Sequence, residues 1–152
     1  MAYIAHPKHV PFEFNRITEH IYIGTNQCCR IHFSSLLLKK GVKGNISLEK
    51  ERIDAPFGVD YFLWIPVLDK KAPTQKQLLL GARAIKDFIE NKLKVYVHCK
   101  RGHGRSPTLV AAYFILAGLT TAKAIQKIRN KRKIHMTNLQ IKALNKFEKS
   151  LK

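Results

Sequence analysis

The chain has 152 residues, 45% of them hydrophobic and 25% charged, which suits one folded domain with its own core. This composition excludes disordered and collagen-like chains, and no apolar run reaches the roughly 20 residues that a membrane span requires. The net charge is unusual: 28 Lys and Arg against 10 Asp and Glu give a net charge of +18, which favours anionic partners. Three cysteines cannot all pair and no secretory pattern opens the chain, so we expect reduced thiols and a cytoplasmic location.

Hydrophobic spacing predicts strands and helices in alternation after a loose N-terminal arm over residues 1–11. The predicted strands are two short ones within 12–23, followed by 42–48, 61–67 and 94–98. The predicted helices are 28–39, a long one from Thr74 to Ile89, 106–116, 121–132 and 137–151. This order favours an α/β fold in which helices cover a sheet.

The segment VHCKRGHGRS at 97–106 joins the end of a predicted buried strand to the start of an apolar helix. Cys99 stands at the strand end, and Arg105 follows six positions later, at the helix start. Gly102 and Gly104 allow the loop amides between them to turn inward. Inward N–H groups, a helix N-terminus and a guanidinium form a cradle for a tetrahedral dianion. The same positive surroundings favour the thiolate of Cys99, which is the nucleophilic form.

Neighbouring residues suit the same chemistry. Arg105 can bind two phosphate oxygens as a fork and hold them as charge moves in the transition state. Ser106 can hydrogen-bond the Cys99 sulfur when the sulfur leaves, and His98 can position the loop through a ring hydrogen bond. The alternative is a buried structural cysteine in a tight turn. The histidine, the two glycines and the strand-to-helix context all argue against that alternative.

This His-Cys-x5-Arg-Ser pattern is the signature of the cysteine-dependent protein tyrosine phosphatase superfamily, and the chain resembles a small dual-specificity phosphatase from about Arg16 to Lys149. ITEHIYIGT resembles the family's first hairpin, and GVKGNISLEKE its second strand and following loop. The resemblance implies a single-domain fold with a central, mostly parallel sheet flanked by helices, and a catalytic domain over 12–152. It also implies that phosphate transfers to the cysteine and is then hydrolysed by water, without a metal or other cofactor.

In that family an aspartate about 30 residues before the cysteine protonates the leaving oxygen. Asp69 lies 30 positions before Cys99, in the loop LDKKAPT between a predicted strand and the long helix. The resemblance therefore implies that Asp69 is the general acid. Asp54, in a Pro- and Gly-containing connection, is the reserve candidate.

The loop also carries three basic side chains, Lys100, Arg101 and His103. The pattern Cys-Lys-x-Gly-x-x-Arg resembles the lipid-directed branch, which includes phosphoinositide 3-phosphatases and mitochondrial-type phosphatidylglycerophosphate phosphatases. The sequence equally allows Lys100 to point to solvent and Arg101 to pair with an acid. It also leaves open whether His103 transfers protons or is a loop residue without a catalytic role. We assign all three, with Gly102, Gly104 and Arg105, to the phosphate-binding loop.

The leading hypothesis is a phosphatase that hydrolyses phosphotyrosine, and also phosphoserine and phosphothreonine, through a cysteinyl-phosphate intermediate. The alternative is a phosphoinositide or phosphatidylglycerophosphate phosphatase. An RNA 5′-triphosphatase and a non-catalytic phosphate-binding module rank lower. The expected substrate is thus a phosphorylated protein or an anionic phospholipid.

The C-terminal segment is strongly basic, with one acid, Glu148, between residues 123 and 152. Its ten cations are Lys123, Lys127, Arg129, Lys131, Arg132, Lys133, Lys142, Lys146, Lys149 and Lys152. These form either a solvated helical face or a docking surface for an acidic partner or a membrane surface, which would make the protein peripheral to the membrane. Nucleic acid is not expected, because no base-stacking aromatic motif accompanies the charge.

The adjacent cysteines Cys28 and Cys29 have no partners at zinc spacing, so no metal site is predicted. We interpret them as core residues at a strand-to-helix turn. The alternative is that one of them is a resolving thiol that protects oxidised Cys99 as a disulfide.

Overall fold

The computed structural model describes residues 11–27 and 32–152, so the predicted arm (except Pro11) and the Cys28–Cys29 pair lie outside the described residues. The strands are β1 (Phe14–Arg16), β2 (Ile21–Gly24), β3 (Val42–Glu49), β4 (Tyr61–Val67) and β5 (Lys94–His98). The helices are α1 (Ser35–Lys39), α2 (Gln75–Glu90), α3 (Arg105–Leu116), α4 (Thr121–Arg129) and α5 (Asn138–Ser150). No helix in these two ranges is long and apolar enough to cross a bilayer.

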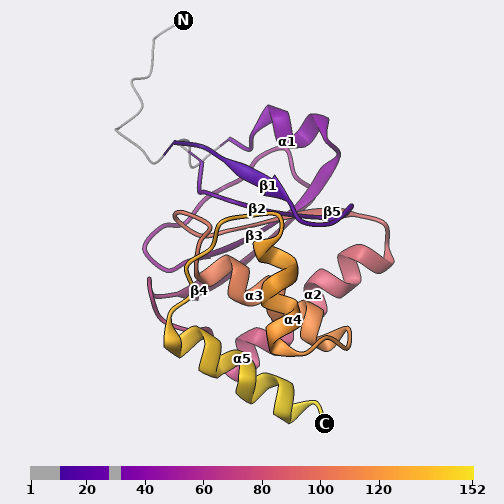
Figure 1. Ribbon diagram of the computed structural model, residues 1–152. Coiled ribbons are helices and arrows are strands. Elements are labelled where there is room, and N and C mark those ends of the chain that lie inside the picture. The colour runs from indigo at the N-terminus through magenta and orange to yellow at the C-terminus, as the bar shows by residue number, and fades with distance from the viewer. Residues whose placement is uncertain (1–10, 28–31) are drawn as a thin grey trace, which may run out of the picture.

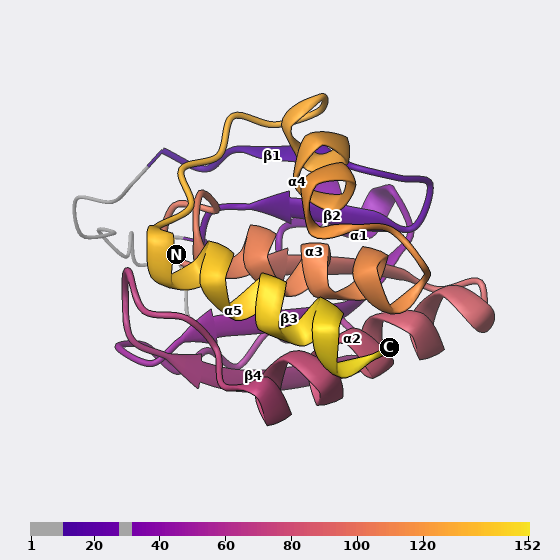
Figure 2. The same ribbon diagram turned by 60° about the horizontal axis from the view of Figure 1, so that its bottom comes forward.

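The five strands form one sheet in the order β1-β2-β5-β3-β4 (Figure 1). Only β1 is antiparallel to its neighbour, and the other pairs are parallel. Helices α2 to α5 cover one face, with α3 against the sheet, and α1 lies on the opposite side (Figures 1 and 2). This arrangement confirms the predicted α/β fold with a mostly parallel sheet.

Alternation along the central strands creates two hydrophobic clusters. Ile23 and Val97 are register partners that face the main core beneath α2 to α5. Tyr22 and Tyr96, also register partners, face the smaller cluster that contains Leu37 of α1. Because side chains of a strand alternate between faces, the two clusters follow directly from the sequence of β2 and β5.

Helix α3 is the apolar centre of the domain, and all of its residues except Tyr113 and Leu116 are buried. Its first residue, Arg105, is therefore buried together with the helix N-terminus. Because β5 lies in the middle of the sheet, the connection from β5 to α3 runs across the carboxyl ends of the parallel strands. Ligand sites of open α/β sheets lie at that edge.

Two predicted helices differ from the structure, and the one expected over 121–132 ends at Arg129. In the described part of the range expected as a helix over 28–39, the helix is α1, because residues 32–34 are not helical and Ser34 caps a helix that begins at Ser35. The Ser34 hydroxyl accepts a hydrogen bond from the N–H of Leu37 at 3.5 Å. An N-cap serine satisfies a helical N–H that has no intrahelical partner, so it marks the start of the helix. By contrast, Thr74 caps α2 as predicted, with a capping box to Gln77.

Candidate active site

Cys99 directly follows β5 and is only 3% exposed. Its Sγ lies 3.3 Å from the Oγ of Ser106, in the first turn of α3. A pocket of about 420 Å³ opens at this point. It is lined by Asp69, Lys70, Cys99, Lys100, Arg101, His103, Gly104, Arg105, His135, Thr137 and Gln140. The predicted nucleophile, arginine and acid thus share one pocket.

The carbonyl groups at the start of the loop are held from behind by hydrogen bonds. The backbone N–H of Asn26 donates to the oxygen of Lys100 at 3.1 Å. The Arg132 guanidinium donates to the oxygens of Arg101 and Gly102, at 2.8 Å each. Three successive peptide groups are therefore anchored to parts of the chain that lie far away in sequence.

The second half of the loop is held in the same way. The N–H of His135 donates to the oxygen of His103 at 2.8 Å, and Thr108 donates its N–H and its hydroxyl to the oxygen of Gly104 at 3.0 and 2.7 Å. In a planar trans peptide the N–H points opposite to the C=O. The N–H groups of residues 101–105 consequently turn to the other side, and no described residue accepts a hydrogen bond from those of 101–104. Such a row of N–H groups forms an anion-binding nest.

Gly102 is the loop position where a side chain has no room. It has a φ of +70°, and a Cβ there would lie 2.5 Å from the carbonyl oxygen of Gly24 and 2.8 Å from the Nη2 of Arg132. Both the left-handed backbone and the close approach favour glycine at this position.

Arg105 is 1% exposed and is held by Glu51, a residue that the sequence analysis missed. Its two terminal nitrogens each donate to one Glu51 carboxylate oxygen at 2.8 Å, and Nη1 also donates to the carbonyl of Val67 at 2.8 Å. Its Nε is buried and has no hydrogen-bond partner within the described residues. Glu51 and Val67 thus take three of the five N–H groups, and the Nε–H and the second N–H of Nη2 have no hydrogen-bond acceptor among the described residues, which suits an oxyanion.

The pKa values of this pair follow from their contact. Hydrogen bonds from Arg105 lower the pKa of Glu51 below 4.5 and outweigh its partial burial. Burial alone would lower the pKa of Arg105, but the Glu51 hydrogen bonds and nearby negative charges raise it. The position of Glu51 just after a predicted strand is a partial signal, and the strand order of the sheet brings it beside Arg105. It follows a strand parallel to β5, so it lies at the same sheet edge as Cys99.

The two aspartates considered for the acid lie in different places. Asp69 is exposed at the pocket, and its Oδ1 is 3.5 Å from the Nη2 of Arg105 and accepts the N–H of Lys70 at 3.0 Å. Asp54 is 8% exposed, does not line the pocket, and forms an ion pair with the Nε of Arg52 at 2.8 Å.

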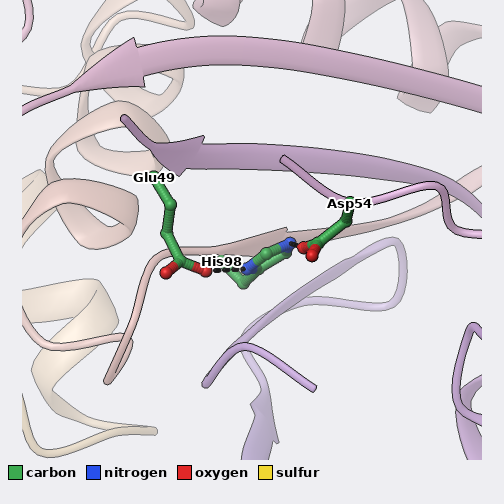
Figure 3. A group of neighbouring side chains, drawn as sticks. All are labelled: Glu49, Asp54 and His98. Atoms are coloured by element: carbon green, nitrogen blue, oxygen red, sulfur yellow. Dashed lines mark ion pairs between the residues drawn. The ribbon is translucent and has the colours of Figure 1, made fainter. Parts of the chain in front are cut away.

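His98 lies beneath the loop, between two acidic side chains (Figure 3). Its Nδ1 is 3.6 Å from the Oε1 of Glu49, and its Nε2 is 3.9 Å from the Oδ2 of Asp54. The Nδ1 also lies 3.4 Å from the carbonyl oxygen of Cys99. The other Glu49 oxygen accepts the side-chain amide of Asn26 at 3.0 Å. Burial raises the pKa of Asp54, although the charges of Arg52 and His98 oppose this shift.

These three side chains also present ligand atoms within 4.8 Å of one another. The two ring nitrogens of His98, however, face different carboxylates (Figure 3). A metal ion needs its ligand atoms to converge on one point. The arrangement is better described as a buried polar cluster in which two carboxylates flank the His98 ring.

The basic loop side chains border the pocket. Lys100, Arg101 and His103 all line it, and neither Lys100 nor Arg101 forms an ion pair with another residue in the described ranges. The His103 and His135 rings pack edge to face, with centroids 5.5 Å apart. Burial lowers the pKa of His103 below 6.5, and the nearby charges of Arg132 and His135 lower it further.

Comparison with known proteins gives one family. The family model "Dual specificity phosphatase, catalytic domain" matches residues 21–150. A "Probable protein tyrosine phosphatase type IVA B" of Dictyostelium discoideum is 29% identical over 146 residues, which cover 94% of this chain and 78% of the relative. The "Phosphatidylglycerophosphatase and protein-tyrosine phosphatase 1" of Homo sapiens is 43% identical over 83 residues, which cover 52% of this chain and 40% of the relative.

Among solved structures, the crystal structure of PTPMT1 superposes with a TM-score of 0.79 at 27% identity, and the match covers 91% of this chain and 96% of that chain. PTPMT1 has also been solved in complex with PI(5)P.

The Glu51–Arg105 pair predicts a pH-dependent stability. Because the pKa of Glu51 is lowered, its contribution to the free energy of unfolding is fully present above pH 4.5, the ordinary pKa of the group. That contribution is lost as the pH falls through the lowered pKa. Near neutral pH, Glu51→Gln is expected to lower the free energy of unfolding by about 1 kcal/mol. This value is typical of a charged hydrogen-bonded pair and is reduced because Glu51 is partly exposed to solvent. Below pH 4.5 the difference should shrink.

Chemical denaturation of both proteins across this pH range measures the effect. Glu19→Gln is the matched control, because Glu19 is exposed. If the loss of unfolding free energy in Glu51→Gln does not depend on pH, the assignment of the ion pair is contradicted.

Proposed function

Because the chain belongs to the dual specificity phosphatase family, we propose that Cys99 is the nucleophile of a reaction that hydrolyses phosphomonoesters through a cysteinyl-phosphate intermediate. Membership confirms the resemblance seen in the sequence, and the protein is a cysteine-dependent protein phosphatase. We further assign this catalysis to a domain over residues 12–152. The observation that carries the site assignment is that Cys99, Arg105 and Asp69 line one pocket beside the anion-binding loop.

In the first step the Cys99 thiolate attacks the phosphorus and a P–S bond forms. The bond from phosphorus to the leaving oxygen breaks, and Asp69 gives its proton to that oxygen. The position of Asp69 supports this role, because its exposed carboxyl group lines the pocket that holds Cys99. General acids of this kind accelerate a reaction typically by about 100- to 10,000-fold.

The charge that develops on the transferring phosphoryl group is met by groups that are already in place. The N–H groups of the loop turn away from their anchored carbonyls, and Arg105 is held by Glu51 with its Nε available. Because these donors do not reorganise during the reaction, they stabilise the transition state more than they would in water.

In the second step, water attacks the phosphorus and the P–S bond breaks. The Cys99 thiolate leaves, and the Asp69 carboxylate accepts the proton of the water. Ser106 supports this step, because its hydroxyl at 3.3 Å can donate a hydrogen bond to the sulfur as negative charge returns to it. His98 supports the loop from below through its contact with the Cys99 carbonyl.

Asp69→Asn tests the assignment of the acid. We expect turnover of alkyl phosphates, whose leaving groups are poor, to fall about 100-fold, whereas activated aryl phosphates lose much less. Asp54→Asn is the comparison, since Asp54 is the reserve candidate and the substitution is the same. Steady-state kinetics on both substrate classes provides the measurement. An equal loss on both classes, or the same pattern in Asp54→Asn alone, would remove Asp69 from the role.

A second candidate substrate is a phosphomonoester on an anionic phospholipid headgroup. Three cationic side chains without an ion-pair partner among the described residues line the pocket, namely Lys70, Lys100 and Arg101. Of the described residues that line the pocket, Asp69 is the only acid. The exposed cations of α4 and α5 provide further attraction to an anionic membrane surface, each worth about 1 kcal/mol there. A cytoplasmic protein that binds such a membrane peripherally fits this charge distribution.

Phosphate release by wild type and Cys99→Ser decides between the substrates. The probes are a phosphotyrosine peptide, a phosphothreonine peptide and vesicles that contain an anionic phosphomonoester lipid. We expect peptide turnover by the wild type and none by Cys99→Ser, because serine cannot supply the thiolate. Turnover in Cys99→Ser would remove the covalent mechanism.

Turnover confined to the vesicles would favour the lipid substrate. In that case Lys100→Gln and Arg101→Gln should each weaken vesicle turnover on the order of fivefold. Arg83→Gln, which removes an exposed charge on α2, is the matched control.

A further inference from the structure

We propose that Arg132 is a positioning residue for the catalytic loop, whose guanidinium fixes two loop peptides so that their N–H groups face the substrate phosphate. The inference rests on the proposed function, because it assigns a role within the same phosphate site. It concerns a residue that lies 27 positions after the signature arginine, in the connection between α4 and α5.

Arg132 differs from every other cation of the basic C-terminal segment. It is 4% exposed, whereas the other nine are exposed. The assignment of Arg132 to an exposed basic face is therefore wrong. A buried guanidinium is costly unless its donors are satisfied, so the contacts that it makes decide its role.

Those contacts reach the loop from behind. The Nε donates to the carbonyl of Gly102 and the Nη2 to the carbonyl of Arg101, both at 2.8 Å. Because each peptide is planar, these bonds direct the N–H groups of Gly102 and His103 to the opposite side of the chain. A single planar cation therefore sets the orientation of two successive donors in the phosphate nest.

The other edge of the guanidinium is anchored at the N-terminal hairpin. The Nη1 donates to the Oδ1 of Asn15 in β1 at 2.8 Å, and the Nη2 pairs with the Oε1 of Glu13 at 3.2 Å. Arg132 thus links the hairpin to the loop through four hydrogen bonds with fixed directions. Lysine carries a point charge and cannot reproduce this planar pattern.

Gly102 provides an independent sign of the fit. A Cβ at this position would approach Arg132 Nη2 to 2.8 Å and the Gly24 carbonyl to 2.5 Å. A side chain at position 102 would therefore displace the guanidinium or the Gly24 carbonyl, so glycine here lets Arg132 approach the loop backbone.

Binding of tungstate, a tetrahedral dianion, and steady-state kinetics on an aryl phosphate test the proposal in the full chain. In Arg132→Gln we expect the tungstate Kd to rise at least about tenfold and kcat to fall about 100-fold, with a smaller change in KM. Arg132→Lys keeps the charge and should recover little of either. Arg83→Gln removes an exposed arginine from α2 and should match the wild type.

To distinguish a positioning role from a purely structural one, tungstate binding and kinetics are measured at a temperature at which near-ultraviolet circular dichroism shows that each variant is folded. Asn15→Ala, which removes one anchor of Arg132, should weaken tungstate binding in the same direction, by about threefold. Its effect should vanish in the Arg132→Gln background, because the two residues act through one contact. If Arg132→Gln does not fold, Arg132→Lys and Asn15→Ala carry the test.

The proposal is overturned if folded Arg132 variants bind tungstate and turn over substrate as the wild type does. The proposed function fails separately, and the role of Arg132 with it, if the wild type neither binds tungstate nor hydrolyses the aryl phosphate.

Discussion

The site depends on one constraint, which is that the carbonyl groups of the loop after Cys99 point away from the pocket. Donors from the segment after β2, from the α4–α5 connection and from α3 hold them there. Since the N–H of a planar peptide opposes its carbonyl, anchoring one side of the loop prepares the other side to bind an anion. A short loop with two glycines would not hold this shape by itself. The scaffold around it supplies the order that the chemistry requires.

The same logic explains how the domain tolerates a buried cation. Arg105 starts a helix that is almost entirely buried, so its charge needs a partner inside the protein. Glu51, whose own side chain is partly exposed, provides that partner with two hydrogen bonds of 2.8 Å and, by doing so, fixes the plane of the fork. His98 is likewise placed by its neighbours, between Glu49 and Asp54. Cys99 thus lies beside polar side chains that constrain one another.

Much of the fold and the centre of the site could be predicted from the sequence. Alternation in β5 and the apolar run of α3 are local signals, and Cys99 and Arg105 lie at the ends of those two elements. Predicting Asp69 also required the family's spacing between the acid and the cysteine, because many loops carry an aspartate. Its presence beside Cys99 depends on the approach of the β4–α2 connection, which local patterns do not specify.

Glu51 and Arg132 were missed for different physical reasons. Contact between Glu51 and Arg105 requires β3 to lie beside β5, and that strand order is a property of the tertiary fold. Arg132 stands in a run of cations, and its chemistry alone does not distinguish it from Lys131 and Lys133. Its spacing does contain a signal, because it lies four residues after the buried Ile128 and so continues the apolar face of α4.

The central claim is that phosphate passes through Cys99, and trapping the intermediate tests it most directly. Wild type and Ser106→Ala would be mixed with an aryl phosphate, quenched rapidly in denaturant at mildly alkaline pH, and digested for mass spectrometry. The account predicts one phosphoryl group on the peptide that contains Cys99. The group should be more abundant in Ser106→Ala, where departure of the thiolate is slower, and absent in Cys99→Ser. Steady turnover with no phosphoryl group on Cys99 in either protein would contradict the account.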